Sequence, residues 1–110
     1  MITTHVLDIA AGRPGKAIAI ELERADGSAW LPVGAGTTDD DGRLRTLTQS
    51  GSVTAGVYRI RFHTGAYLAA QGRDGFFPVV EIQFTVSDGA QHYHVPLLLS
   101  PFGYSTYRGS

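Results

Sequence analysis

Hydrophobic and polar residues alternate in short runs along the whole chain, and turn residues separate these runs. In residues 17–24, for example, Ile18, Ile20 and Leu22 alternate with alanine and glutamate, which is typical of a strand with one buried and one exposed face. Fourteen glycines and five prolines interrupt the pattern, as in all-β proteins with many turns. The pattern predicts strands over residues 3–8, 17–24, 30–33, 43–47, 57–62, 79–86, 91–99 and 104–108.

Only residues 64–71 have a helical pattern. Thr64 is placed to cap the start of this helix and Gly72 to end it, because these residue types favour those positions. Seven to eight short strands and one short helix predict an all-β fold of two packed sheets, a β-sandwich, with a closed barrel as the alternative. A chain of 110 residues suits a single domain over residues 1–110.

The predicted strand over residues 57–62 has one hydrophobic and one basic face. Arg59 and Arg61 alternate with Tyr58, Ile60 and Phe62, so the arginines are expected to point away from the core. Opposite charges on neighbouring strands stabilise a sheet when they face each other. We therefore expect the two arginines to form ion pairs with acidic residues of adjacent strands, namely Glu21, Glu23 or Glu81.

The predicted strand over residues 91–99 is rich in hydrophobic groups on both faces. One face carries His92, His94, Pro96 and Leu98, and the other carries Tyr93, Val95, Leu97 and Leu99. In a small sandwich, such a strand needs a cover on its outer face as well as a core on its inner face, and a second copy of the chain provides one. The pattern therefore predicts a homo-oligomer.

Charge and composition narrow the classes of function. Nine basic and ten acidic residues give a net charge of −1, so the bulk charge does not favour nucleic acid as a partner. The absence of cysteine excludes disulfide frameworks and thiolate chemistry, and it fits a reducing compartment. The sequence shows no hydrophobic leader and no membrane-spanning run. We therefore expect a cytoplasmic protein with no membrane partner.

Histidine spacing offers the first candidate for chemistry. His92 and His94 lie two residues apart on one strand face, a spacing that presents both imidazoles to one ligand. With His5 on a neighbouring strand, they could form a three-histidine zinc site that activates water. A structural role, in packing or in a hydrogen bond between strands, is a second interpretation.

A third interpretation needs no metal. A histidine can act as a general base near neutral pH, with Ser110 or Thr106 passing on a proton. Arg43 or Arg108 could hold an anionic substrate or the oxyanion that forms when water adds to a carbonyl. Residues 107–110 are dense in aromatic and hydrogen-bonding groups, which predicts a segment held in the structure rather than a frayed one.

Several motifs follow one another along the chain. They are Thr4-His5-Val6-Leu7-Asp8 with Gly12-Arg13-Pro14, then Asp41-Gly42-Arg43, Phe76-Phe77-Pro78, and the stretch from His92-Tyr93-His94 to Tyr107-Arg108-Gly109-Ser110. Together they resemble, from end to end, the 5-hydroxyisourate hydrolases, the transthyretin-related enzyme family of urate breakdown. The final Tyr-Arg-Gly-Ser motif separates these enzymes from transthyretin itself, the hormone carrier, which lacks it.

The resemblance implies a transthyretin-like sandwich that forms a homotetramer, a dimer of dimers with active sites along a central channel. It also implies hydrolysis of the cyclic amide of 5-hydroxyisourate to 2-oxo-4-hydroxy-4-carboxy-5-ureidoimidazoline, in purine breakdown toward allantoin, with no metal or organic cofactor. By motif position, His5, His94 and Ser110 resemble the catalytic group that activates water. The residues that resemble the substrate-binding group are His5, Arg43, Tyr107 and Arg108. Our working hypothesis makes His94 the base.

Other classes of function stay open at the level of sequence. The main alternative is a transthyretin-type binding module that holds an aromatic small molecule without catalysis. A zinc hydrolase, or a structural sandwich domain with no site at all, would also fit parts of the pattern.

Overall fold

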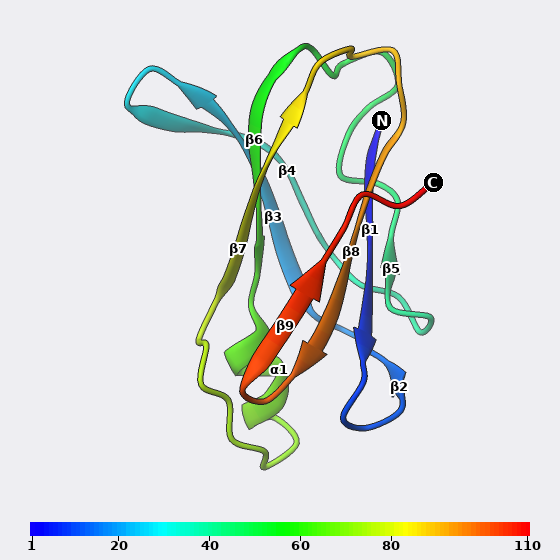
Figure 1. Cartoon of the computed structure of the whole chain (residues 1–110), viewed down its shortest axis with the longest axis vertical. Coiled ribbons are helices and arrows are strands. Elements are labelled where there is room, and N and C mark those ends of the chain that lie inside the picture. Colours follow the sequence, from blue (N-terminus) through cyan, green and yellow to red (C-terminus); the bar gives the residue numbers. More distant parts are fainter.

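The computed structural model describes residues 1–110 and contains two β-sheets and one short helix (Figure 1). The first sheet has the order β2-β1-β8-β9, with β5 also paired to β1, and the second has the order β4-β3-β6-β7. The strands are β1 (Ile2–Asp8), β2 (Arg13–Pro14), β3 (Ala19–Asp26), β4 (Ala29–Thr37), β5 (Arg43–Leu44), β6 (Gly56–Phe62), β7 (Val80–Val86), β8 (Tyr93–Ser100) and β9 (Gly103–Thr106). The predicted two-sheet sandwich is therefore confirmed.

The core lies between the two sheets and contains twenty hydrophobic side chains. The alternation in the sequence sets which residues enter it: Ile20 and Leu22 point inward from β3, and Ile60 and Phe62 from β6, each with at most 1% of its surface exposed. Burying one side chain of this size contributes about 1.5–3 kcal/mol. The chain thus builds its core from strand patterning without disulfides.

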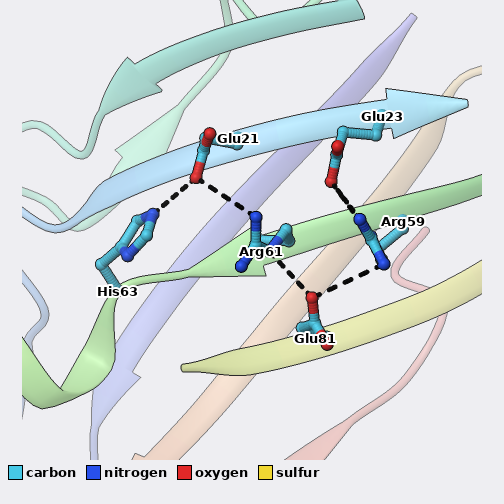
Figure 2. Close-up of polar contacts among 6 residues, drawn as sticks. All are labelled: Glu21, Glu23, Arg59, Arg61, His63 and Glu81. Atoms are coloured by element: carbon cyan, nitrogen blue, oxygen red, sulfur yellow. Dashed lines mark hydrogen bonds and ion pairs between the residues drawn. The ribbon is translucent and has the colours of Figure 1, made fainter. Parts of the chain in front are cut away.

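The outer face of the second sheet carries the ion pairs that the sequence predicted (Figure 2). Arg59 binds Glu23 at 2.8 Å and Arg61 binds Glu81 at 2.8 Å. The pairing register explains these contacts, since Arg61 lies opposite Glu21 on β3 and opposite Glu81 on β7. His63 extends the row, with its Nε2 2.6 Å from Glu21. This histidine therefore has a surface partner far from the first sheet.

The predicted strand over residues 43–47 is wrong beyond Leu44. Only Arg43 and Leu44 pair with β1, after which the chain leaves the first sheet and packs against β4 of the second. The contact is close: a Cβ added to Gly34 would lie 1.9 Å from the carbonyl oxygen of Leu47. β4 is longer than predicted, because every one of its residues except Val33 pairs with β3 in a long hairpin, and Val33 lies unpaired at the bulge opposite Leu22/Glu23.

The predicted helix is present as α1 (Thr64–Ala69), but its cap is not the expected one. Thr64 is the first helical residue rather than the cap, and its hydroxyl donates to the carbonyl of Phe77 at 3.2 Å. His63 occupies the cap position without a side-chain hydrogen bond. Gly72 has a φ of +66° just after the helix, a conformation that glycine adopts without strain. No helix in the chain is long and apolar enough to cross a membrane.

The end of β1 is tied to α1 and to the segment that follows it. The buried Asp8 carboxylate accepts hydrogen bonds from Tyr67 Oη at 2.8 Å and from two nitrogens of Arg73 at 2.6 and 3.1 Å. The Arg73 hydrogen bond is the largest cause that lowers the pKa of Asp8 to about 2, against the opposing effect of burial. This ion pair closes one end of the sandwich.

The parallel pairing of β1 with β8 places the candidate residues on one surface. Thr3 lies opposite His94, and His5 lies opposite Pro96, while Arg43 of β5 lies opposite His5 from the other side. Residues paired in this way point to the same face of a sheet. The outer face of the first sheet therefore gathers His5, His94 and Arg43, and both termini lie beside this sheet (Figure 1).

Candidate active site

A polar cavity of about 350 Å³ opens on this outer face. Its lining comes from β1, β5, the residue after β5, the start of β8 and the C-terminal segment, and only one of its residues is hydrophobic. The lining residues are Met1, Thr3, Thr4, Arg43, Arg45, His92, His94 and Ser110. The cavity therefore offers cations, imidazoles and hydroxyls rather than an apolar surface.

His94 is the half-buried imidazole in this cavity. Burial lowers its pKa below the usual 6.5, and the positive charge of Arg43, that of His5 and His92 in their protonated forms, and that of Arg45 lower it further. Its Nδ1 lies 2.8 Å from the hydroxyl of Thr3, while its Nε2 has no hydrogen-bond partner in the chain. His94 is thus neutral at neutral pH, the state that a general base requires.

Arg43 and Arg45 supply the positive charge of the cavity. Neither guanidinium forms an ion pair or a side-chain hydrogen bond within the chain, so both are free to bind an anion or a polarised carbonyl. The turn before β5 fixes the backbone position of Arg43, because the Asp39 carboxylate accepts hydrogen bonds from the backbone N–H groups of Asp41 and Arg43, each at 2.9 Å. Of these, the bond from Arg43 contributes most to lowering the pKa of Asp39.

His5 lies on the same face but does not line the cavity. Its Nε2 donates a hydrogen bond to the carbonyl of Asp41 at 2.8 Å, and so it braces the turn that presents Arg43. Its charge still acts on His94, whose pKa it lowers. A direct contact of His5 with substrate stays a prediction.

The C-terminal segment passes over His94. The backbone N–H of Gly109 donates to the carbonyl of His94 at 2.7 Å, which forms an isolated antiparallel bridge. A Cβ added to Gly109 would lie 2.7 Å from Cδ2 of His94, so this residue packs directly on the imidazole. The bridge delivers Ser110 into the cavity.

Tyr107 and Arg108 do not line the polar cavity. Both line a second cavity of about 290 Å³, which also includes Tyr93, Val95 and the edge strand β7. The Arg108 guanidinium lies 4.3 Å from the centre of the Tyr93 ring and donates to the side chain of Gln91 at 3.0 Å. Within one chain, Arg43, His94 and Ser110 are therefore together, whereas Tyr107 and Arg108 are not with them.

Comparisons with known proteins match the whole of this chain. The model of the HIUase/Transthyretin family matches residues 2–109. The chain belongs to this family. It is 41% identical over 110 residues to the 5-hydroxyisourate hydrolase of Salmonella typhimurium, a match that covers 100% of this chain and 81% of that protein.

Solved structures of both kinds of family member share the fold. The structure of Klebsiella pneumoniae 5-hydroxyisourate hydrolase superimposes with a TM-score of 0.86 at 35% identity, covering 99% of this chain and 98% of that one. Sea bream transthyretin in complex with thyroxine gives a TM-score of 0.92 at 34% identity, covering 98% and 93%. Because the fold fits a carrier as well as a hydrolase, the side chains of the cavity must separate the two functions.

Five cavity residues were not among the sequence-predicted site residues: Met1, Thr3, Thr4, Arg45 and His92. Thr3 carries a usable signal, since it lies two residues before His5 and so shares its face in a strand. Arg45 has no such signal, because it enters the cavity only where the chain leaves the sheet after β5. His92 was considered as a zinc ligand or as a structural residue. No group of three or more His, Cys, Asp and Glu side chains could hold a metal ion.

Proposed function

We propose that this chain hydrolyses the cyclic amide of 5-hydroxyisourate to 2-oxo-4-hydroxy-4-carboxy-5-ureidoimidazoline. The observation that carries the proposal is the neutral imidazole of His94 in one polar cavity with two unpaired guanidinium groups. The names of the relatives agree, since the hydrolases of Salmonella typhimurium and mouse are 41% and 40% identical to this chain.

The chemistry follows from the positions of these groups. His94 removes a proton from water through Nε2, and the resulting hydroxide adds to the ring carbonyl. Arg43 and Arg45 bind the oxygen-rich ring and stabilise the oxyanion of the tetrahedral intermediate. When the carbon–nitrogen bond breaks, His94 returns the proton to the leaving nitrogen. The new carboxylic acid then loses its own proton to solvent, so the reaction balances without an added reagent.

The wider set of site residues belongs to the same proposal. His5 orients the substrate beside Arg43, and Ser110 helps to hold the attacking water near His94. Tyr107 and Arg108 bind substrate only if another copy of the chain brings them to the cavity, since within one chain they line a different surface.

We also propose that the protein assembles as a homotetramer. The outer face of the first sheet carries half-buried Leu7 and Leu98 beside the site, and Phe76 and Phe102 expose 69% and 72% of their surfaces. Exposed hydrophobic groups of this extent are typical of interfaces between subunits. A second copy facing the open cavity would cover Leu7 and Leu98 and exclude bulk water from the reaction, and a further contact would cover Phe76 and Phe102 at the β8–β9 turn.

The test is a spectroscopic hydrolase assay on freshly generated 5-hydroxyisourate, which also decays spontaneously. We expect a rate well above the spontaneous one, and a loss of about 10²–10⁴-fold in kcat for His94→Ala. His63→Ala is the matched control, because His63 lies between β6 and α1, away from the first sheet, and binds Glu21. Near-normal turnover in His94→Ala would remove His94 as the base. A rate no faster than spontaneous decay, with tight binding of an aromatic ligand, would favour a carrier instead.

A further inference from the structure

Thr3 lies between two imidazoles at the edge of the cavity. Its Oγ1 is 2.8 Å from Nδ1 of His94 and 2.8 Å from Nε2 of His92. The register of β1 on β8 produces this geometry, because Thr3 lies opposite His94 and His92 is two residues before it. Thr3 is 4% exposed, so its hydroxyl has little access to other partners.

A hydroxyl has only one hydrogen to donate, so the two bonds cannot both run outward from Thr3. Both rings could also donate to Oγ1, but the hydroxyl hydrogen of Thr3, which is 4% exposed, would then have no acceptor in the chain. With both imidazoles neutral, two bonds that also use this hydrogen form only if one ring donates to Oγ1 and Oγ1 donates to the other ring. Either His94 carries its proton on Nδ1 and donates it to Thr3, or His92 donates from Nε2 and His94 accepts. Only the first arrangement leaves the Nε2 of His94 with a free lone pair.

Electrostatics favours this first arrangement. Because Nδ1 of His94 is taken by Thr3, Nε2 is the only ring nitrogen that can face the cavity, which it shares with Arg43 and Arg45. Positive charge disfavours an N–H dipole pointing toward it and favours a lone pair. His5 adds a further positive charge near His94 when protonated. The proton of His94 is therefore more stable on the side of Thr3.

We propose that Thr3 is a positioning residue. Its Oγ1 accepts a hydrogen bond from Nδ1–H of His94 and donates a hydrogen bond to Nε2 of His92. The bond fixes both the tautomer and the orientation of His94, so that Nε2 is ready to take a proton from water. His92 acts as the acceptor that sets the direction of the Thr3 hydroxyl. This role rests on the proposed function only for its effect on turnover; the tautomer itself is a property of the free protein.

The first experiment measures the tautomer directly. Long-range nitrogen–proton NMR spectra of ¹⁵N-histidine-labelled protein distinguish a protonated from an unprotonated ring nitrogen at a pH where His94 is neutral. We expect His94 to be protonated on Nδ1 in the wild type and in Thr3→Ser, and to populate the Nε2-protonated form in Thr3→Val. His92→Leu should also mix the two forms, because the Thr3 hydroxyl then loses its acceptor. Wild-type His94 protonated on Nε2 would overturn the proposal.

The second experiment measures turnover in the same variants. Groups that orient a functional histidine typically matter by about 10–100-fold, so we expect kcat to fall by that factor in Thr3→Val with little change in KM. Thr3→Ser should recover most of the rate. Thr64→Val is the matched control, because Thr64 is 1% exposed and its hydroxyl donates to a carbonyl at the far end of the sandwich.

The two readouts separate failure of this inference from failure of the proposed function. Normal kcat in Thr3→Val with an unchanged His94 tautomer would overturn the role of Thr3 while leaving the hydrolase intact. An inactive wild type would instead refute the proposed function, and the tautomer spectra would still support or refute the arrangement around Thr3.

Discussion

At the scale of single residues, the positive charges around His94 should set the pH dependence of the reaction. A base works only when unprotonated, so kcat/KM should fall as the pH drops through the pKa of His94, which burial and neighbouring cations hold below 6.5. Because the guanidinium of Arg43 is one of these cations, Arg43→Gln should move the midpoint upward toward 6.5 as well as weaken substrate binding. The measurement is a pH profile of kcat/KM for both proteins.

Arg13→Gln is the control for this shift. Arg13 lies at the other end of β1, where it donates to Gln71, so its loss should leave the midpoint unchanged. A midpoint that stays in place in Arg43→Gln would mean that the group observed in the profile is not His94. The other titratable or charged groups near the cavity are His5, His92, Arg45 and the amino group of Met1.

The sequence predicted site residues whose side chains are themselves reactive, and it missed residues whose role depends on how two strands pair. Residue types offered the histidines, Arg43 or Arg108, and Ser110 as candidates. The resemblance in motif position then singled out Arg43, His94 and Ser110, and all three line the cavity. Thr3 was missed because an alternating pattern shows which face a threonine occupies, but not which side chain of β8 lies opposite. That register is decided by the parallel pairing of residues 91 apart in sequence, which local patterns do not encode.

At the scale of elements, the C-terminal segment should depend on the absence of a side chain at one position. In Gly109→Ala, the new Cβ would lie 2.7 Å from Cδ2 and 3.3 Å from Cγ of His94, closer than such atoms pack. Either the imidazole or the segment must move, so we expect kcat to fall by at least about 10-fold with the fold retained. Gly103→Ala is the matched control, since its nearest contact would be an ordinary 3.8 Å from Ser100.

A second element-scale prediction concerns the ion pair that joins β1 to the segment after α1. The folded-state pKa of Asp8 is about 2, below its ordinary value of 3.8, so its ionised form stabilises the fold. This contribution, about 2 kcal/mol, is complete above the unfolded pKa and is lost as the pH falls from about 4 to 2. Asp8→Asn should remove it and leave Arg73 without its partner, lowering the free energy of unfolding at pH 6 by about 2–4 kcal/mol.

Urea unfolding at several pH values checks this prediction. The difference in stability between wild type and Asp8→Asn should be largest at pH 6 and should shrink toward pH 2. Asp40→Asn provides the comparison, because Asp40 and its partner Lys16 are 87% and 64% exposed, and exposed pairs contribute little. Equal effects of the two substitutions would contradict a special role for Asp8.

Most strands and the helix were predictable because neighbouring residues determine them. The errors occur where a contact with a distant residue determines the structure. Strands β3 and β6 follow from alternation, which is a property of neighbouring residues. The helix cap was wrong because the hydroxyl of Thr64 finds a partner in Phe77, thirteen residues away, rather than in the first turn of the helix. The short β5 has a similar origin, since the chain after Leu44 packs against Gly34 of the other sheet.

At the scale of the whole molecule, the proposed assembly makes a prediction about an aromatic patch on the surface. We define this aromatic patch as Phe76, Phe77, Phe102 and Tyr104. Phe77 contacts both Phe76 and Tyr104 edge-on, with ring centres 5.0 and 5.3 Å apart, and Phe102 exposes 72% of its surface. A patch of this kind is costly in water and favourable at an interface between subunits.

Phe102→Glu should therefore shift the protein toward smaller species without unfolding it, because the new carboxylate would be buried against an apolar surface. Sedimentation velocity gives the size distribution, and the assay gives activity at the same protein concentrations. If the site is completed by a second copy, activity should fall with dissociation and should return in part at high concentration.

Val57→Glu adds the same charge to a residue that is 38% exposed on the outer face of the second sheet and should leave both measurements unchanged. A fully assembled Phe102→Glu protein would exclude the aromatic patch from the interface, and a dissociated protein with full activity would show that one chain holds a complete site.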